Sequence, residues 1–296
     1  MKLYTFEFSG QRRIGAERGG RLVDFNASPE VPQDMISLLR GGDAAMAAAK
    51  RVQANGTITH LFSDVRLLAP VPRPGKILSS GINYRGHLQE EPGATLPETP
   101  FFFSKLPSCV IGSGQPIEHS PLTKQLDYEV ELAVVIGKTA KNLDETKIMQ
   151  AVAGYTIHHD VSARDVQMKD HQITLGKNFD TFAPMGPCMV TADEIPDPTN
   201  HHLWLRTWLN GQLMQDSSTS DWVFPLPHLL SVLNRIMTLE PGDIVSTGCP
   251  AGVGLFRNPQ IFLKHGDVVR LEIEKIGVLE NPVVAEAELA AASGRG

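Results

Sequence analysis

Residues 127–137 read DYEVELAVVIG, with acids at every second position followed by an unbroken apolar run. Successive side chains of a β-strand point to opposite faces, so Asp127, Glu129 and Glu131 would share one face. The run 132–136 is typical of a strand that is covered on both sides. Three like charges at the entrance to such a strand repel one another and are costly to bury. The segment therefore needs either a cation on its acidic face or an edge position where that face meets solvent.

A third acid occurs in a similar setting. Asp160 ends the segment GYTIHHD, which is rich in strand-forming residues. Two carboxylates at alternate positions of one strand, joined by a third from a neighbouring strand, form one open side of an octahedral oxygen site. Mg²⁺ and Mn²⁺ prefer oxygen ligands and keep the remaining positions for water or substrate oxygens. The candidate metal ligands are therefore Glu129, Glu131 and Asp160, with a solvent-exposed edge strand as the alternative.

The pattern along the chain divides it into a small N-terminal domain, residues 1–70, and a larger domain, residues 71–296. The first contains three short strand patterns, in LYTFEF, RRIGAE and RLVDF. Two helical patterns with glycine stops follow between residues 35 and 56. Three prolines within residues 67–77 indicate a linker or an extended entry strand.

The larger domain reads mainly as strands, interrupted by helical patterns at residues 144–154, which Gly154 would close, and at 225–239. Many strands with few helices favour a β-rich α+β fold. We therefore expect a mixed β-roll or β-barrel that carries helices on its outside, preceded by a small α/β domain.

Bulk properties exclude several classes of function. A formal net charge of −6 and a pI near 5.9 give no basic surface for nucleic acid. No apolar run reaches the ~18 residues of a membrane-spanning helix, and the charged start MKLYTFEFSGQRR lacks the apolar region of a signal peptide. The three cysteines are widely separated and odd in number, which fits a reducing cytosol. We expect a cytoplasmic protein without nucleic-acid or membrane partners.

Seven segments, in this order, match the pattern of a known family. They are GINYRGHLQE (81–90), FFFSK (101–105), DYEVELAVVIGK (127–138), GYTIHHDVSARDVQ (154–167), LGKNFDTFAPMGP (175–187), LNGQLMQDSSTSDWVF (209–224) and LEPGDIVSTGCPAGVG (239–254). The chain resembles the fumarylacetoacetate hydrolase family, near its acylpyruvate hydrolase and 2-hydroxyhepta-2,4-diene-1,7-dioate isomerase members. The resemblance implies a β-roll catalytic domain, a homodimer and bound Mg²⁺ or Mn²⁺. Members hydrolyse a C–C bond, decarboxylate, hydrate or isomerise 2-keto and 2,4-diketo acids.

The resemblance also implies roles for individual residues. His87 and Glu90 fall on a water-activating pair that a mobile lid carries, and residues 91–100 continue that lid. Lys177 falls on a lysine that meets a developing enolate. Glu129, Glu131 and Asp160 fall on the family's three metal ligands. The matched substrate-binding residues are Arg164 and Gln167, near the metal and the substrate, and Thr247 and Gly248, which grip the substrate carboxylate.

These residue types suit the chemistry of keto acids. A 2-keto acid offers a carboxylate oxygen and a keto oxygen to one cation, which stabilises the enolate that forms. Cleavage of a 2,4-diketo acid between C3 and C4 leaves that enolate, and Lys177 adds a second positive charge to it. His87 can accept a proton from water, while Glu90, three residues along one helical turn, orients the imidazole.

Three hypotheses remain open for the function. The first is a metal-dependent hydrolase that cleaves a C–C bond of a 2,4-diketo acid. The second is an oxaloacetate-type decarboxylase, or an isomerase or hydratase of a 2-keto dicarboxylate from aromatic catabolism. These routes also need the enolate and the metal, and decarboxylation needs no activated water. The third is a non-catalytic binding protein, in which His87, Glu90 and Lys177 would have no evident use. The sequence assigns no role to His158 or His159, and it assigns Cys249 to packing.

Overall fold

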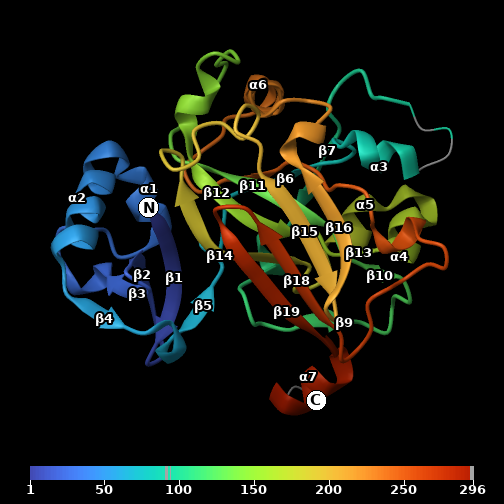
Figure 1. Cartoon of the computed structure of the whole chain (residues 1–296), viewed down its shortest axis with the longest axis horizontal. Coiled ribbons are helices and arrows are strands. Elements are labelled where there is room, and N and C mark those ends of the chain that lie inside the picture. The colour runs from blue at the N-terminus through green and yellow to red at the C-terminus, as the bar shows by residue number, and fades with distance from the viewer. Residues whose placement is uncertain (91–92, 94, 294–296) are drawn as a thin grey trace.

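The computed structural model describes residues 1–90, 93 and 95–293, which form a sheet-rich α+β fold (Figure 1). One large sheet crosses the molecule, and its hydrogen-bonded path runs from β4 to β7 without closing among the described strands. The predicted β-rich α+β class is confirmed, as an open sheet and not a closed barrel. In spatial order the path is β4 (Ile58–His60), β3 (Arg21–Asp24), β2 (Gln11–Arg18), β1 (Lys2–Phe8), β14 (Ala183–Thr191), β12 (Val152–His159), β11 (Val130–Ile136), β17 (Ile244–Ser246), β6 (Ile77–Ser80) and β7 (Phe102–Lys105).

The N-terminal part follows its sequence pattern closely. The three predicted strands are β1, β2 and β3, paired antiparallel, and the predicted helices are α1 (Met35–Arg40) and α2 (Gly42–Asn55). The side chain of Asp34 caps α1 by accepting a hydrogen bond from the Ser37 N–H at 2.9 Å. β1 also pairs with β5 (Arg66–Leu68) and with β14, so the sheet continues across the boundary expected near residue 70 (Figure 1). The domain boundary itself stays a prediction.

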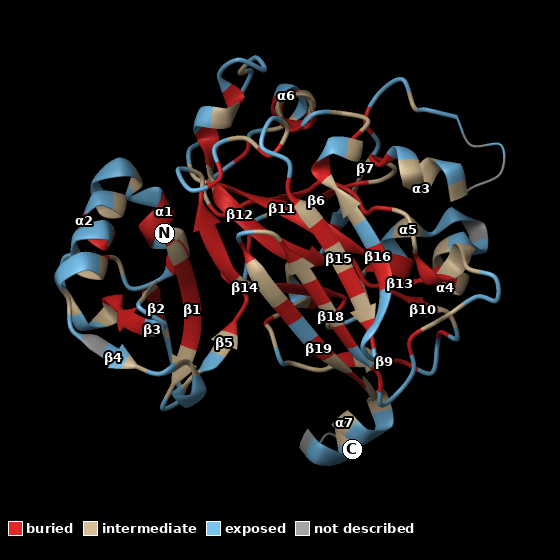
Figure 2. Ribbon diagram, in the orientation of Figure 1, coloured by how far each residue is buried: buried red, intermediate tan, exposed pale blue. Residues whose placement is uncertain are grey.

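A second sheet covers the central strands of the first. It contacts β11, β12 and β14, and the apolar core lies between the two layers. Figure 2 shows the central strands as the most deeply buried part of the molecule. In order, the strands of the second sheet are β16 (Gln212–Ser218), β15 (Trp204–Leu209), β18 (Val268–Ile273), β19 (Gly277–Ala285) and β9 (Ile117–His119).

The acidic segment enters this core in two pieces. β10 (Leu126–Asp127) pairs with β13 (Ser162–Ala163), and the next piece, β11, pairs with β12 on one side and β17 on the other. Glu129 lies in the short break between β10 and β11. Every residue of β11 is buried. The segment is therefore central, and the alternative of a solvent-exposed edge strand is wrong.

The two helical patterns of the larger domain have different outcomes. The pattern at 225–239 is confirmed as α6 (Leu226–Ile236), whose leucines at spacings of three and four face the core. The pattern at 144–154 is wrong as a helix, because it forms only a 3₁₀ turn, Ile148–Ala151, before β12 begins. Gly154 does not stop a helix. It lies in β12, where a Cβ would lie 2.2 Å from the carbonyl oxygen of Val190 in the next strand.

Three short helices lie together at one side of the sheets: α3 (Arg85–Glu90), α4 (Arg164–Met168) and α5 (Ile173–Lys177) (Figure 1). α5 contacts α4, β7 and β13, so these helices meet the strand ends that carry the acids. The C-terminal helix α7 (Glu286–Ser293) and the short β8 (Val110–Ile111) lie elsewhere. Among the described residues, no helix is long and apolar enough to cross a membrane.

Candidate active site

A cavity of about 210 Å³ opens where α3, α4 and α5 meet the start of β11 and the end of β6. Part of its wall is aromatic, from Phe101, Phe103 and Phe256. The rest brings together charged and polar side chains from distant parts of the chain. Those that the sequence predicted are His87, Glu129, Glu131, Arg164, Gln167 and Lys177.

Glu129 and Glu131 line this cavity although they are only 4% and 1% exposed. Glu129 accepts hydrogen bonds from Arg164 Nη2 at 2.6 Å and from Lys177 Nζ at 2.8 Å. Although burial opposes ionisation, Lys177 and Arg164 hold the pKa of Glu129 below its usual value. Burial, together with the charges of Asp160 and Glu129, raises the pKa of Glu131 well above its usual value. Glu129 therefore has two basic partners, whereas Glu131 has no lysine or arginine partner among the described residues.

A hydroxyl group holds Glu131 in place. Ser246 Oγ donates a hydrogen bond to Glu131 Oε2, and His158 Nδ1 lies 2.9 Å from the same hydroxyl oxygen. Strand pairing brings these groups together. β12 places His158 opposite Glu131, and β17, which carries Ser246, lies on the other side of β11. Because the serine proton goes to the carboxylate, His158 donates through Nδ1–H to the serine oxygen. His158, which the sequence left without a role, thus orients a candidate metal ligand.

The ammonium group of Lys177 bridges Asp160 and Glu129. Asp160 Oδ2 accepts a hydrogen bond from Lys177 Nζ at 2.8 Å, and Asp160 Oδ1 lies 2.5 Å from Lys105 Nζ. Although burial opposes ionisation, Lys105 and Lys177 hold the pKa of Asp160 far below its usual value. Lys177 bridges two of the three predicted metal ligands. Asp160 is not among the described residues that line the cavity.

Asp127, the first acid of the series, accepts hydrogen bonds from the Arg164 side chain and from two backbone N–H groups of the loop at 254–255. Its Oδ2 accepts from Arg164 Nε at 2.9 Å, and its two oxygens accept the backbone N–H groups of Gly254 and Leu255 at 2.7 and 3.0 Å. Arg164 also donates to Gln167 at 3.2 Å. Together with the bond to Glu129, these two bonds use three of the five N–H donors of the guanidinium and leave the other two for a bound anion.

His87 and Glu90 form the predicted pair on α3. His87 Nδ1 lies 2.8 Å from Glu90 Oε2. A carboxylate oxygen accepts this hydrogen bond from Nδ1–H, and in the neutral form of the imidazole the lone pair then lies on Nε2. The other oxygen of Glu90 accepts the Gly252 N–H at 2.8 Å, which ties α3 to the loop that follows β17. The predicted lid, 91–100, lies partly outside the described residues, at positions 91, 92 and 94.

Thr247 and Gly248 are not among the described residues that line the cavity. Thr247 is fully buried, and its hydroxyl donates to the Leu132 carbonyl at 2.9 Å. Gly248 has a φ of 88°, and a Cβ there would lie 2.7 Å from the carbonyl oxygen of Gly81. Packing and backbone geometry account for both residues. Their role in gripping a substrate carboxylate stays a prediction.

Two buried groups of the site, Lys105 and Cys249, were given no chemical role from the sequence. Lys105 is 2% exposed, and burial lowers its pKa while the adjacent Asp160 opposes that shift. Lys105 ends the strand-like run FFFSK. A lysine that is buried at such a position needs an acidic partner, so the run could have indicated an acid beside Lys105. Cys249 has a ligating sulfur within 4.8 Å of carboxylate oxygens of both Glu129 and Glu131. Burial, and then these two acids, raise the pKa of its thiol.

The donors of the cavity fit a divalent cation. Two buried carboxylates lie within 4.8 Å of each other, and oxygen ligands are those that Mg²⁺ and Mn²⁺ prefer. In the described chain, Glu131 has no lysine or arginine within 4.0 Å. The ammonium of Lys177 already acts as a cation shared by Glu129 and Asp160. A bound cation would supply the positive charge that Glu131 lacks.

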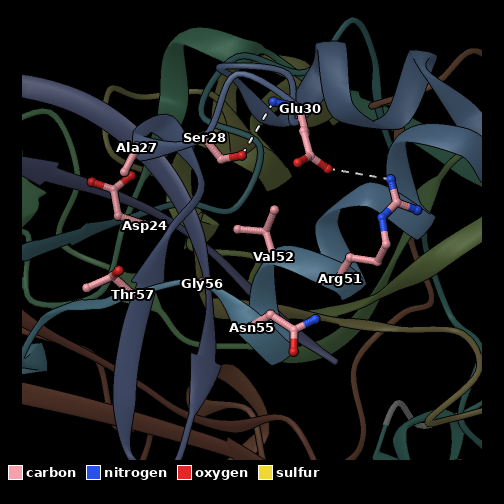
Figure 3. A pocket seen from close by; sticks show the side chains of 9 residues that line it. All are labelled: Asp24, Ala27, Ser28, Glu30, Arg51, Val52, Asn55, Gly56 and Thr57. Carbon is pink, nitrogen blue, oxygen red and sulfur yellow. Dashed lines mark hydrogen bonds and ion pairs between the residues drawn. The ribbon is translucent and has the colours of Figure 1, made fainter.

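A second pocket, of about 450 Å³, lies in the N-terminal part (Figure 3). Its buried acid, Asp24, is already paired with Arg13 at 2.6 Å and with His60 at 3.3 Å. Its other ion pair, between Glu30 and Arg51, spans 3.6 Å between two exposed side chains (Figure 3). This pocket does not gather acid–base groups as the first cavity does.

Comparison with known proteins identifies the family. The model described as fumarylacetoacetate (FAA) hydrolase C-terminal matches residues 76–284. Oxaloacetate tautomerase Fahd2a, mitochondrial, of Rattus norvegicus is 45% identical over 275 residues, which cover 92% of this chain and 87% of that protein.

Solved structures agree with this assignment. The fumarylacetoacetate hydrolase of psychrophilic Exiguobacterium antarcticum aligns with a TM-score of 0.84 at 38% identity, covering 97% of this chain and 100% of the other. The maleylpyruvate hydrolase of Sphingobium sp. SYK-6, solved in complex with manganese (II) ion and pyruvate, aligns with a TM-score of 0.80 at 29% identity, covering 96% and 99%. The resemblance found in the sequence is confirmed, and this chain belongs to the fumarylacetoacetate hydrolase family of enzymes.

Proposed function

We propose that this enzyme is a divalent-metal-dependent tautomerase that interconverts the keto and enol forms of a small 2-oxo dicarboxylate of the oxaloacetate type. One observation carries the proposal: the His87–Glu90 pair, the Lys177 ammonium and the buried acids Glu129 and Glu131 face one cavity. The rat relative named as an oxaloacetate tautomerase supports this choice among enolate reactions. Isomerisation was part of the second hypothesis from the sequence, and this proposal prefers it to the first hypothesis, C–C bond hydrolysis.

The proton transfer is assigned to His87. In the keto-to-enol direction, Nε2 accepts a proton from C3, and Glu90 at Nδ1 stabilises the imidazolium that forms. Lys177 Nζ–H donates to the C2 oxygen, where negative charge develops. The imidazolium then gives its Nε2 proton to that oxygen, which restores neutral His87, and the enol leaves. The enol-to-keto direction runs the same steps in reverse.

The cation would be held by Glu129 and Glu131, with Asp160 adjacent and Mg²⁺ or Mn²⁺ as the proposed ions. When bound, it acts as a Lewis acid on the oxygen that bears the enolate charge. The manganese in the complex of the maleylpyruvate hydrolase supports this assignment.

The remaining contacts favour a small dianion. Arg164 and Gln167 line the cavity next to Glu129, and the unused N–H groups of Arg164 suit a carboxylate. The cavity volume of about 210 Å³ is smaller than the ~300–1,000 Å³ typical of sites for drug-sized ligands. A four-carbon 2-oxo dicarboxylate matches this size and charge.

Hydrolysis of a 2,4-diketo acid is the second candidate. The same His87–Glu90 pair can take a proton from water instead of from C3, and the likeness to a maleylpyruvate hydrolase supports this reaction. The two candidates differ in products, because tautomerisation leaves the carbon skeleton intact.

One experiment separates the candidates. The purified enzyme with Mg²⁺ is given enol-oxaloacetate, and the decay of the enol ultraviolet absorbance is followed while pyruvate is measured in the same sample. The proposal predicts accelerated decay without extra pyruvate, and loss of that acceleration in His87→Ala. Unaccelerated decay together with rapid cleavage of an acylpyruvate would replace tautomerisation by hydrolysis.

Two further expectations belong to the proposal. A homodimer, expected from the family resemblance, is testable by light scattering. A cytoplasmic location was expected from cysteine usage, but the relative's name places that protein in mitochondria. A purely cytoplasmic location is therefore not supported by the relatives.

A further inference from the structure

We propose that Cys249, together with Glu129 and Glu131, forms a second donor set at the metal site, which binds a thiophilic divalent cation of the Zn²⁺ class and blocks catalysis. The inference rests on the proposed metal site, since both donor sets share the two glutamates. It adds a sulfur ligand and an inhibitory ion to that site.

The geometry places the three donors around one point. The Cys249 sulfur and one carboxylate oxygen from each glutamate all lie within 4.8 Å of one another, and all three residues are buried. In a tetrahedral site, bonds of ~2.0–2.3 Å place two ligand atoms of one zinc ion about 3.3–3.5 Å apart. Side-chain rotations that shorten each separation by up to ~1.5 Å therefore close the set. Asp160 needs a larger change, because Lys177 first has to leave it.

A second observation points to a ligand in the same space. Ser80 lines the cavity with Cys249 and both glutamates, and it is 2% exposed. Its Oγ is buried and has no hydrogen-bond partner among the described residues. A buried hydroxyl without a partner costs free energy, whereas a water or ion in the cavity would satisfy it.

The donor chemistry then decides which ion uses which set. Mg²⁺ and Mn²⁺ are bound by oxygen ligands, whereas thiolate favours zinc and related ions. At a given site the affinity is lowest for Mn²⁺, rises through Co²⁺ to Cu²⁺, and falls again at Zn²⁺. Zn²⁺ binds cysteine as thiolate, so the S–H bond breaks, a metal–sulfur bond forms and the proton passes to the buffer. No oxidant or reductant is involved.

Coordination number links this set to inhibition. Zinc with three protein ligands is usually tetrahedral and keeps one open position. A 2-oxo acid that chelates through two oxygens needs two. The zinc-loaded enzyme is therefore expected to be inactive toward substrates that the magnesium-loaded enzyme converts.

Cobalt titration of the metal-free enzyme tests the sulfur ligand without any substrate. Bound Co²⁺ gives weak visible bands with any donor set, and an intense ultraviolet charge-transfer band only with a thiolate. We expect both signals in the wild type and in Cys109→Ser and Cys188→Ser, which alter the other two buried cysteines. Cys249→Ser is expected to keep the visible bands and lose the ultraviolet band. Visible bands without the ultraviolet band in the wild type, its persistence in Cys249→Ser, or no bound Co²⁺ at all would overturn the proposal.

Calorimetry with Zn²⁺ gives a second readout. Titrations in two buffers of different ionisation enthalpy should show one more proton released by the wild type than by Cys249→Ser, with affinity weakened at least ~10-fold in the variant. Equal proton release would contradict sulfur ligation. If the cobalt–sulfur band is present while oxaloacetate is not tautomerised with Mg²⁺, the metal inference holds and the proposed reaction fails.

Discussion

Lys177 Nζ lies 2.8 Å from Glu129 Oε2, inside the cavity where the sequence predicts a divalent cation. The same ammonium lies 2.8 Å from Asp160 Oδ2. Without a metal ion, one lysine therefore bridges two of the three acids, each of which has one further basic partner, Arg164 or Lys105. The Lys177 ammonium and a bound cation would therefore compete for the same carboxylates.

Replacing Lys177 by methionine should destabilise the metal-free enzyme by about 3–5 kcal/mol, because two buried carboxylates lose their shared cation. Mg²⁺ should restore more stability to the variant than to the wild type, since the ion then faces no competing ammonium. Urea unfolding with EDTA and with Mg²⁺ measures both effects. Lys138→Met, which removes an exposed partner of Asp43, is the matched control. Equal loss in the two variants would refute the shared-cation account.

Replacing His87 by glutamine should lower turnover by ~10²–10⁴-fold while the fold is retained, because the variant has no proton acceptor at the former Nε2. Steady-state kinetics on enol-oxaloacetate and circular dichroism provide the measurement. The partly exposed pair His228–Glu145, with Nδ1 and Oε1 2.7 Å apart, offers a control of the same residue types. His228→Gln should retain full activity, and a similar loss in both variants would show that His87 has no special role.

Replacing Ser246 by alanine should weaken Mn²⁺ binding by ~10–100-fold and cost about 1–3 kcal/mol, because Glu131 loses the hydroxyl that orients it. Ser79 is the matched control. It pairs in register with Ser246 across β6 and β17, is equally buried, and its Oγ has no partner among the described residues. Ser79→Ala should leave Mn²⁺ binding unchanged. If Ser246→Ala binds Mn²⁺ as tightly as Ser79→Ala, the hydroxyl does not position Glu131.

Acid should destabilise the metal-free enzyme through its buried histidines. Burial lowers the pKa of His159 from 6.5 to about 3, so the folded protein keeps this side chain neutral where the unfolded chain binds a proton. The unfolded state then holds more protons, and stability falls as pH drops from about 6.5 toward 3, by up to ~1.4 kcal/mol per pH unit for this group. Unfolding free energies between pH 6.5 and 5 should fall less steeply in His159→Asn. The exposed His202→Asn should keep the wild-type slope, and an unchanged slope in His159→Asn would contradict the assignment.

The sequence predicted what local patterns determine. The run after Glu131 indicated a central strand, which the structure confirms. The family resemblance singled out His87 and Glu90, whose spacing fits one helical turn, and the structure shows the pair at 2.8 Å. Asp160, by contrast, was expected beside both glutamates, and the structure places Lys177 between it and Glu129.

The partners that strand pairing supplies could not be predicted. Ser246 lies 115 positions after Glu131, and only the neighbouring strand β17 brings its hydroxyl to the carboxylate. Cys249 reaches the same acids by the loop that follows, and nothing beside it in the sequence indicates an acidic neighbour. Gly154 was misread because a glycine at a close approach of two strands looks the same in sequence as one that ends a helix.

Binding of Mn²⁺ to the metal-free enzyme tests the central claim most directly, with free Mn²⁺ measured by electron paramagnetic resonance. The account predicts one ion bound per chain in the wild type, and loss of that binding in Glu129→Gln and in Glu131→Gln. A wild type that binds no Mn²⁺, or variants that bind it as the wild type does, would contradict the account.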